Sequence, residues 1–202
     1  MDDLLGMAVI GRDSSTRDWL LWTKAWCHPI ALERRKSEAA RYRDFERDGD
    51  LVVVSEIGQD ISQAGDIIQQ LDETGLLGDI GVDPFGIGEI VDEFESRGID
   101  NARIVKVPQG WRLNGAIKTA ERRVAGNEEG GERMIHSGSR MMAWCVGNAK
   151  GEPRGNAIAV TKQVSGAGKI DPIMAMFIAV ALMNLNPEAR TSRVSDNYEA
   201  VI

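Results

Sequence analysis

Hydrophobic residues along this chain recur at two spacings, which predict strands and helices in alternation. Apolar stretches at residues 5–12 and 18–26 flank a polar turn, and this pattern predicts an antiparallel hairpin. A thin apolar stripe then predicts a highly charged helix over residues 31–47, on the outside of the protein. From residue 51 onward, strands and helices alternate. This order is typical of an α/β fold with a mixed central sheet and helices on both faces.

The later elements lead to one unusually apolar helix. We expect strands at residues 51–54, 79–83, 103–107 and 157–163, and helices beginning near residues 61, 87, 113 and 141. Asp60 is the expected N-cap of the first of these helices. Residues 173–183 are apolar on every side, so this last helix must be buried, with Asp171 as its N-cap and Pro172 in its first turn. No linker divides the chain, which predicts one domain over residues 1–187 and a polar tail over residues 188–202.

Composition is that of an ordinary globular protein. The chain has 202 residues, of which 43% are hydrophobic and 27% are charged. No apolar run reaches the roughly 18 residues of a membrane span, and the N-terminus lacks the basic start of a secretory signal. Two cysteines, Cys27 and Cys145, cannot form a disulfide framework. These features predict an intracellular protein without a membrane partner.

Charge is distributed unevenly along the chain, and this matters more than the net value of -7. Residues 1–100 contain 10 basic and 22 acidic side chains, whereas residues 101–202 contain 14 and 9. The surplus is densest between Arg103 and Lys169, with 12 basic and 5 acidic residues. Such a stretch could bind a phosphate backbone, although charge runs are more often simply solvated surface.

Familiar nucleotide and metal motifs fail at defining positions. Residues 165–169 resemble a phosphate-binding loop, but Gln163 and Ile170 stand where the loop needs glycine and a hydroxyl residue. We therefore expect no ATP site. Residues 85–88 lack the third glycine of a dinucleotide fingerprint. The paired spacing of a zinc site is missing from Cys27, His28, His136 and Cys145.

Two Asp-Pro pairs remain as the candidate chemistry. Asp83 follows an apolar strand, and Asp171 begins the apolar helix. Taken singly, each is more often a turn or a helix cap than a ligand. Together they could hold Mg²⁺ or Mn²⁺ in a two-metal site, because hard divalent cations prefer carboxylate oxygens. Lys162 and Lys169 are close enough in sequence to hold a nucleic-acid strand there.

The run from Asp2 to Glu188 resembles the C-terminal nuclease domain of the large terminase subunit of tailed bacteriophages. The resemblance rests on residues 4–12, 81–84, 109–111, 142–149 and 168–172. It implies an RNase H-like fold and a Mg²⁺- or Mn²⁺-dependent endonuclease that cuts concatemeric double-stranded DNA during packaging in the bacterial host cytoplasm. It also implies the terminase ATPase domain, the small terminase subunit and the portal as partners. Asp83 and Asp171 match the family's second and third acidic ligands.

The chain departs from the family at its start. In the family, the first catalytic Asp ends a strand that precedes residues 5–12, and an ATPase domain comes before that strand. Here Met1 stands just before residues 5–12, so the expectation is an N-terminally truncated domain in which Asp2 or Asp3, with Asp3 as the candidate ligand, is a weak substitute. Loss of one of three ligands should weaken metal binding.

Three hypotheses remain open for this chain. The first is an active endonuclease whose DNA phosphates are held by Arg112, Lys118, Arg122, Lys162 and Lys169. The second is a catalytically inactive DNA-binding or assembly remnant of the terminase. The third is a different RNase H-like nuclease, such as a resolvase.

Overall fold

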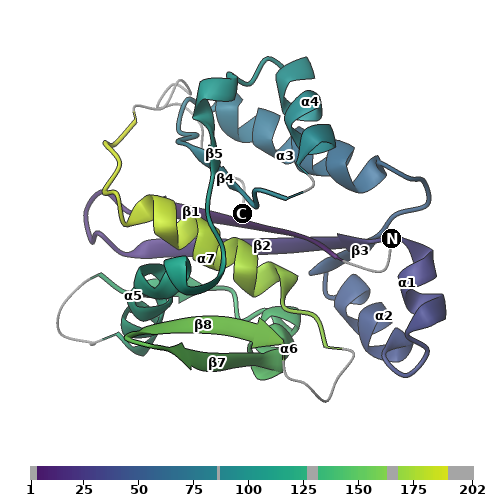
Figure 1. The fold of residues 1–202 in the computed structure, drawn as a ribbon. Helices are drawn as coiled ribbons and strands as arrows, with labels where there is room; N and C mark the ends of the chain where they lie inside the picture. Colours follow the sequence, from purple (N-terminus) through teal and green to yellow (C-terminus); the bar gives the residue numbers. More distant parts are fainter. Residues whose placement is uncertain (1–3, 86, 127–131, 163–167, 191–202) are drawn as a thin grey trace.

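The computed structural model describes residues 4–85, 87–126, 132–162 and 168–190. Helices and strands alternate along these residues and surround one long apolar helix, α7 (Figure 1). The strands are β1 (Leu5–Arg12), β2 (Trp19–Cys27), β3 (Leu51–Val53), β4 (Ile80–Val82), β5 (Ile104–Lys106), β6 (Met134–His136), β7 (Ala149–Arg154) and β8 (Ala157–Lys162). The helices are α1 (Pro29–Arg34), α2 (Ala39–Arg47), α3 (Gln59–Glu73), α4 (Gly88–Ser96), α5 (Asn114–Ala125), α6 (Arg140–Asn148) and α7 (Asp171–Met183), with short 3-10 helices η1 (Asn101–Arg103) and η2 (Gly110–Leu113).

The predicted hairpin is confirmed, and it places β1 at the edge of the main sheet and β2 at its centre. β1 and β2 pair antiparallel from Leu5 opposite Trp26 to Arg12 opposite Trp19. Their turn is held by Asp13, whose carboxylate accepts backbone N–H groups of Ser15 and Thr16. β2 also pairs in parallel with β3 and with β6, which gives a four-stranded mixed sheet.

Two further strand pairs lie outside this sheet. β4 and β5 pair in parallel beside α3 and α4, and β7 and β8 form an antiparallel hairpin below α7 (Figure 1). Within the described ranges, β1 pairs with β2 alone and β4 with β5 alone. The expected α/β class, with a mixed sheet that begins in an antiparallel hairpin, is therefore confirmed.

Helix α7 crosses the main sheet and packs closely on β1. A Cβ added at Gly6 would lie 2.7 Å from the Asp171 carbonyl carbon and oxygen, so only glycine permits this approach. Phe177 and Val180 are buried in the main hydrophobic cluster. The expectation that α7 is buried on every side is wrong for one stripe, however, because Met174, Ala175 and Ala179 are only half-buried.

Several predicted boundaries are also wrong. The single outer helix over residues 31–47 is two helices, α1 and α2, and α2 is not merely external, because Tyr42 and Phe45 are buried. Gly58, rather than Asp60, is the N-cap of α3. Ile170 is the N-cap of α7, and Asp171 is its first helical residue, with Pro172 next to it in the first turn.

Two strands were not predicted from the sequence. β6 is only three residues long, and β7 is polar and contains Gly151 and Pro153. No helix in the described part of the chain is long and apolar enough to cross a membrane.

Candidate active site

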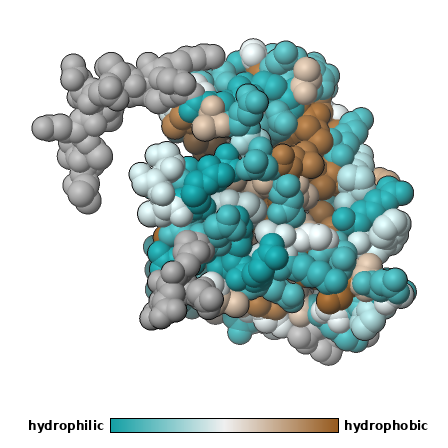
Figure 2. Space-filling view, turned by 90° about the vertical axis from the view of Figure 1, so that its left-hand side faces the viewer, coloured by the Kyte–Doolittle hydropathy of each residue, from teal (hydrophilic) through white to brown (hydrophobic). Residues whose placement is uncertain are grey.

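Asp83 and Asp171 line the same cleft although 88 positions separate them in the sequence. The cleft has a volume of about 1560 Å³ and lies between β1 and β4, with α3 and α7 on its sides. On the face shown in Figure 2, hydrophobic side chains gather in a band across the upper half of the molecule, bordered by hydrophilic surface. The two predicted carboxylates therefore share one solvent-accessible depression with a largely apolar wall.

Asp83 is held in place by the turn that follows β4. It comes directly after Val82, the last residue of that strand, and its side chain is exposed. One carboxylate oxygen accepts the backbone N–H of Phe85 at 3.0 Å. This is the turn contact that an Asp-Pro pair predicts, and it orients the carboxylate at the strand end, where the cleft opens.

Asp171 reaches the cleft from the first turn of α7. Its side chain is partly buried, and one of its carboxylate oxygens is shielded from solvent. The helix dipole favours a negative charge at this position. The pKa of the neighbouring Cys145 thiol is raised to about 12, chiefly by burial and further by the charge of Asp171. The charge of Asp171 therefore acts on a buried thiol of α6, and its side chain also lines the cleft.

The two carboxylates suit hard divalent cations. Mg²⁺ and Mn²⁺ take carboxylate oxygens together with water and substrate phosphate oxygens, so one or two protein carboxylates per ion are enough. Within the described ranges, no group of three or more His, Cys, Asp or Glu side chains is arranged to hold a metal ion. Asp3, the weaker candidate ligand, lies outside the described residues.

The five predicted DNA-binding cations differ in exposure. Lys162 is exposed at the end of β8 and lines the cleft with the two carboxylates. Arg112, Lys118 and Arg122 are exposed on η2 and α5. Lys169 is only 2% exposed, so a direct surface contact between its ammonium group and DNA does not fit its position. Its backbone carbonyl accepts a hydrogen bond from Asn148, which ties the start of α7 to α6.

Part of the basic surplus has a structural role instead. Four of the arginines between residues 103 and 169 form ion pairs with acidic side chains of other segments, namely Arg103, Arg123, Arg133 and Arg140. The guanidinium of Arg123 also lies 3.7 Å from the centre of the Trp19 ring. The cations available for phosphates are therefore fewer than the charge count suggests.

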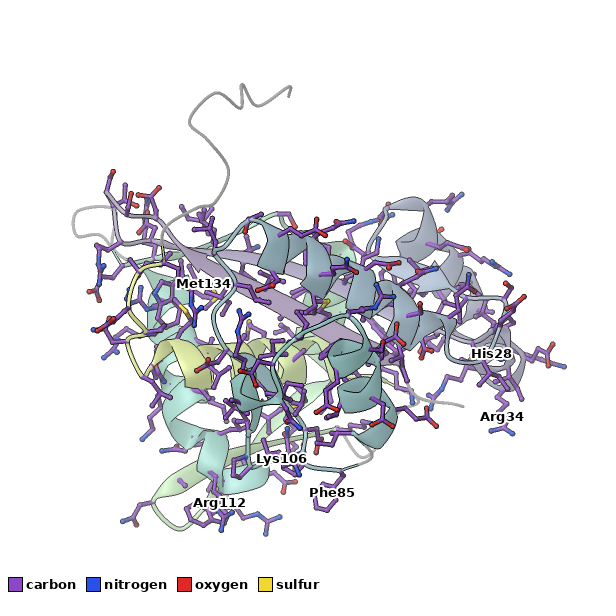
Figure 3. The ribbon with its side chains drawn as sticks, turned by 90° about the horizontal axis from the view of Figure 1, so that it is seen from above. His28, Arg34, Phe85, Lys106, Arg112 and Met134 are labelled. Carbon is purple, nitrogen blue, oxygen red and sulfur yellow. The ribbon has the colours of Figure 1, made fainter. Side chains whose placement is uncertain are left out.

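Sequence reasoning assigned no role to three exposed side chains, two of which lie at the end of β4. Lys106 ends β5 and pairs in register with Val82, the residue before Asp83. Phe85 and Trp111 are 83% and 60% exposed, and Arg112 lies over the Trp111 ring at 5.5 Å. Phe85, Lys106 and Arg112 lie along one edge in Figure 3, away from His28 and Arg34. The parallel pairing of two predicted strands that end at the same point could have indicated Lys106.

Comparisons with known proteins agree with this geometry. A solved structure described as the crystal structure of the HK97 bacteriophage large terminase is similar to the chain, with a TM-score of 0.71 and 21% identity. The match covers 90% of this chain but only 37% of the HK97 chain. At this identity it supports the fold, which is RNase H-like. No curated protein matches the sequence.

A family comparison extends the match from fold to family. The model of the family described as "Terminase large subunit, endonuclease domain" matches residues 31–186, which is most of the chain. This range contains both candidate carboxylates and every predicted DNA-binding cation. The chain therefore belongs to the terminase large subunit endonuclease domain family.

Proposed function

We propose that this chain is a metal-dependent DNA endonuclease that cuts concatemeric DNA during phage genome packaging. The observation that carries the proposal is that Asp83 and Asp171, from the end of β4 and the start of α7, line one cleft in a terminase endonuclease domain. Two carboxylates and a lysine that line one cleft are suitable groups for phosphodiester hydrolysis assisted by Mg²⁺ or Mn²⁺.

The two carboxylates have complementary positions for this chemistry. Asp83 is exposed at a strand end, where a DNA phosphate can approach, and Asp171 is partly buried at a helix start. Divalent ions bound there would neutralise charge on the phosphodiester and activate the attacking water. Asp83 and Asp171 would hold those ions, and Lys162, which lines the same cleft, would hold a phosphate of the scissile strand.

Exposed cations outside the cleft would bind the flanking DNA. Arg112, Lys118 and Arg122 lie on η2 and α5, and no ion pair joins any of them to another described residue. Contacts of this kind position a duplex without reading its sequence. The terminase ATPase domain, the small subunit and the portal would be partners of this chain in the cytoplasm of the bacterial host. They would direct its activity to the DNA that is being packaged.

A plasmid assay tests the proposal. Supercoiled plasmid incubated with the protein and Mn²⁺ should be nicked, and Asp171→Ala and Asp83→Asn should each abolish nicking. Asp79→Asn is the matched control, because Asp79 lines the same cleft at the other end of β4. This control should cut at the wild-type rate.

The alternative function is a catalytically inactive DNA-binding or assembly module. Wild-type protein that retards DNA on a gel but never cuts it, with Mg²⁺ or with Mn²⁺, would overturn the enzyme proposal in favour of this alternative. Equal nicking by wild type and by Asp171→Ala would instead show that the nicking does not depend on the proposed site.

A further inference from the structure

The most exposed phenylalanine and the most exposed tryptophan of this chain lie in two separate loops. Phe85 is 83% exposed, whereas each of the other three phenylalanines is no more than 5% exposed. Trp111 is 60% exposed, and the next most exposed tryptophan, Trp22, is 42% exposed. Single exposed hydrophobic side chains are normal on a protein surface. The significance of these two rings therefore depends on whether they lie together and on what surrounds them.

The two loops begin at the carboxyl ends of one pair of parallel strands. β4 and β5 end in register, with Val82 opposite Lys106, and the Val107 N–H donates to the Val82 carbonyl at 2.9 Å. Phe85 follows Val82 by three residues, and Trp111 follows Val107 by four. A chain spans at most about 3.6 Å per residue, so the Cα atoms of both aromatic residues lie within about 15 Å of this hydrogen bond. The two rings therefore belong to one small area of the surface.

The backbone that carries each ring is anchored to the rest of the protein. The Phe85 N–H donates to the Asp83 carboxylate at 3.0 Å. The short helix η2, which contains the tryptophan, ends in the buried side chain of Leu113. The Asn114 side chain, next in sequence, accepts the Ile158 N–H at 2.9 Å and ties this segment to β8. Because the backbone is already held in place, a ligand that covers the rings has little ordering cost to overcome.

Two exposed cations accompany the rings. Lys106 ends β5, and the Arg112 guanidinium lies 5.5 Å from the centre of the Trp111 ring. In the described part of the chain, no ion pair joins either cation to an acidic side chain. Phe85 lies along the same edge of the molecule as both cations (Figure 3). This combination is typical of surfaces that bind single-stranded DNA, where cations hold the phosphates and bases stack on aromatic rings.

Unpaired DNA fits these groups better than duplex DNA or a protein partner does. The bases of a duplex are stacked on one another and present only their edges in the grooves, so an exposed ring cannot stack on them. Unpaired bases offer both faces for stacking. Aromatic residues also occur in protein interfaces, but lysine and aspartate are depleted there. Here Lys106 and Asp83 both lie at the strand ends from which the two loops begin.

We propose that Phe85 and Trp111 form a stacking platform that binds unpaired DNA bases beside the cleft. Lys106 and Arg112 hold the phosphates of the same strand. The inference deepens the proposed endonuclease function, and its consequence for cleavage rests on that function. A strand that stacks on Phe85 passes Asp83, two residues earlier, so the stacking platform places an unpaired segment at the proposed cleavage site. The binding itself needs neither a metal ion nor cleavage.

Tryptophan fluorescence in metal-free buffer tests the stacking directly. The probe is an oligothymidylate of about 12 nucleotides, a length within the range that single-strand binding sites cover. Bases stacked on Trp111 should quench its emission, so the titration should give a saturable decrease that Trp111→Phe removes. Trp22→Phe is the matched control and should keep the decrease, because Trp22 is exposed on β2 and does not line the cleft. A fully paired duplex of the same length should cause no such decrease.

Two results of this titration would overturn the proposal. One is an oligothymidylate that binds but leaves the Trp111 emission unchanged, which would assign binding to the cations alone. The other is an oligothymidylate that does not bind, which would leave the exposed rings as a contact surface for a protein.

Removal of either ring measures its contribution to the affinity. Phe85→Ala and Trp111→Ala should each weaken oligothymidylate binding by about tenfold, because a stacked base contributes an effect of that order. Both variants should bind duplex DNA within about twofold of wild type, since a duplex does not use the rings. Ile57→Ala is the control for loss of an exposed apolar side chain outside the cleft, and it should bind as wild type does. Wild-type affinity of both folded ring variants for oligothymidylate would overturn the proposal.

A substrate with an unpaired segment tests the consequence for cleavage. With Mn²⁺, wild type should cut a duplex that contains about six unpaired nucleotides at least about tenfold faster than the same duplex fully paired. The double variant Phe85→Ala/Trp111→Ala should lose this preference. Equal wild-type rates on the two substrates would overturn the placement of an unpaired strand at the cleavage site. Cleavage of neither substrate would overturn the nuclease proposal alone, because the binding measurements without metal decide the stacking platform independently.

Discussion

Substitution of Gly6 by alanine should displace the start of α7 and with it Asp171. A Cβ at this position would lie 2.7 Å from the Asp171 carbonyl carbon and oxygen and 2.8 Å from the Pro172 nitrogen. These are backbone atoms, so no side-chain rotation can relieve the contact. Gly11 lies in the same strand, and a Cβ there would meet nothing within 4 Å. Gly6→Ala and Gly11→Ala are therefore a matched pair.

The size of the effect follows from the size of the overlap. Carbon atoms in contact normally lie about 3.5–4 Å apart, so the helix start must move by roughly 1 Å. Overpacking of this kind costs about 1–3 kcal/mol. For a domain of this length, each kcal/mol lowers Tm by about 2–4 °C. Gly11→Ala should change the free energy of unfolding by less than about 0.5 kcal/mol.

Thermal unfolding and plasmid cleavage measure the two consequences. Gly6→Ala should melt several degrees below Gly11→Ala. It should also cut about 100-fold more slowly at a temperature where both are folded, because a displacement of about 1 Å in a catalytic group has an effect of that order. If the two variants melt within about 1 °C of each other and cut equally fast, the close packing of β1 on the start of α7 does not position the site.

Three further predictions concern groups outside the cleft. The hydrogen bond from Arg133 holds the pKa of Asp18 in the folded protein below its ordinary value of 3.8. The ionised carboxylate therefore adds its full stability to the fold above about pH 4, and this stability is lost as the pH falls through the pKa of Asp18 in the folded protein. The Tm difference between wild type and Asp18→Asn should therefore be constant from about pH 5 to 8 and shrink below about pH 4, and a difference that grows on acidification would contradict this reasoning. Burial raises the pKa of Cys27 to about 11 and that of Cys145 to about 12. A thiol reagent at about pH 8 should therefore label neither cysteine until denaturant is added. Rapid labelling of the native protein would show that the cysteines are not buried. The last prediction concerns the exposed cations Arg112, Lys118 and Arg122. Replacing all three by glutamine should reduce the slope of the logarithm of the binding constant for duplex DNA against the logarithm of the salt concentration by about 2.7. Arg34→Gln is the control and should leave this slope unchanged, because Arg34 lies far from Arg112 in Figure 3.

The helices and strands around the candidate site could be predicted because each depends mainly on the residue pattern within its own segment. Residues 5–12 and 18–26 show apolar stretches around a polar turn, and they form the predicted hairpin. Asp83 and Asp171 were recognised because each marks the boundary of a strand or helix next to proline. Their place in one cleft depends on how β4 and α7 pack together, and the spacing of residues along the chain does not determine this packing.

The missed features depend on contacts between distant segments. Residues 35–38 separate α1 from α2 without a glycine or proline to indicate a break. β7 has no alternating apolar pattern and exists because it pairs with β8, from Ala149 opposite Lys162. Lys169 looked like a surface cation beside a glycine-rich stretch, yet it is buried beneath the start of α7. The half-buried stripe of α7 was hidden by the same uniform hydrophobicity that made the helix easy to predict.

The most direct test of the central claim is a double-mutant cycle on Asp83 and Asp171. Cleavage rates of supercoiled plasmid at saturating Mn²⁺ are measured for wild type, Asp83→Asn, Asp171→Asn and the double variant, each shown to be folded by circular dichroism. Residues that act as one unit are non-additive, so each single variant should lose about as much activity as the double variant. Losses that simply multiply, or a single variant that keeps the wild-type rate, would show that the two carboxylates do not form one catalytic site.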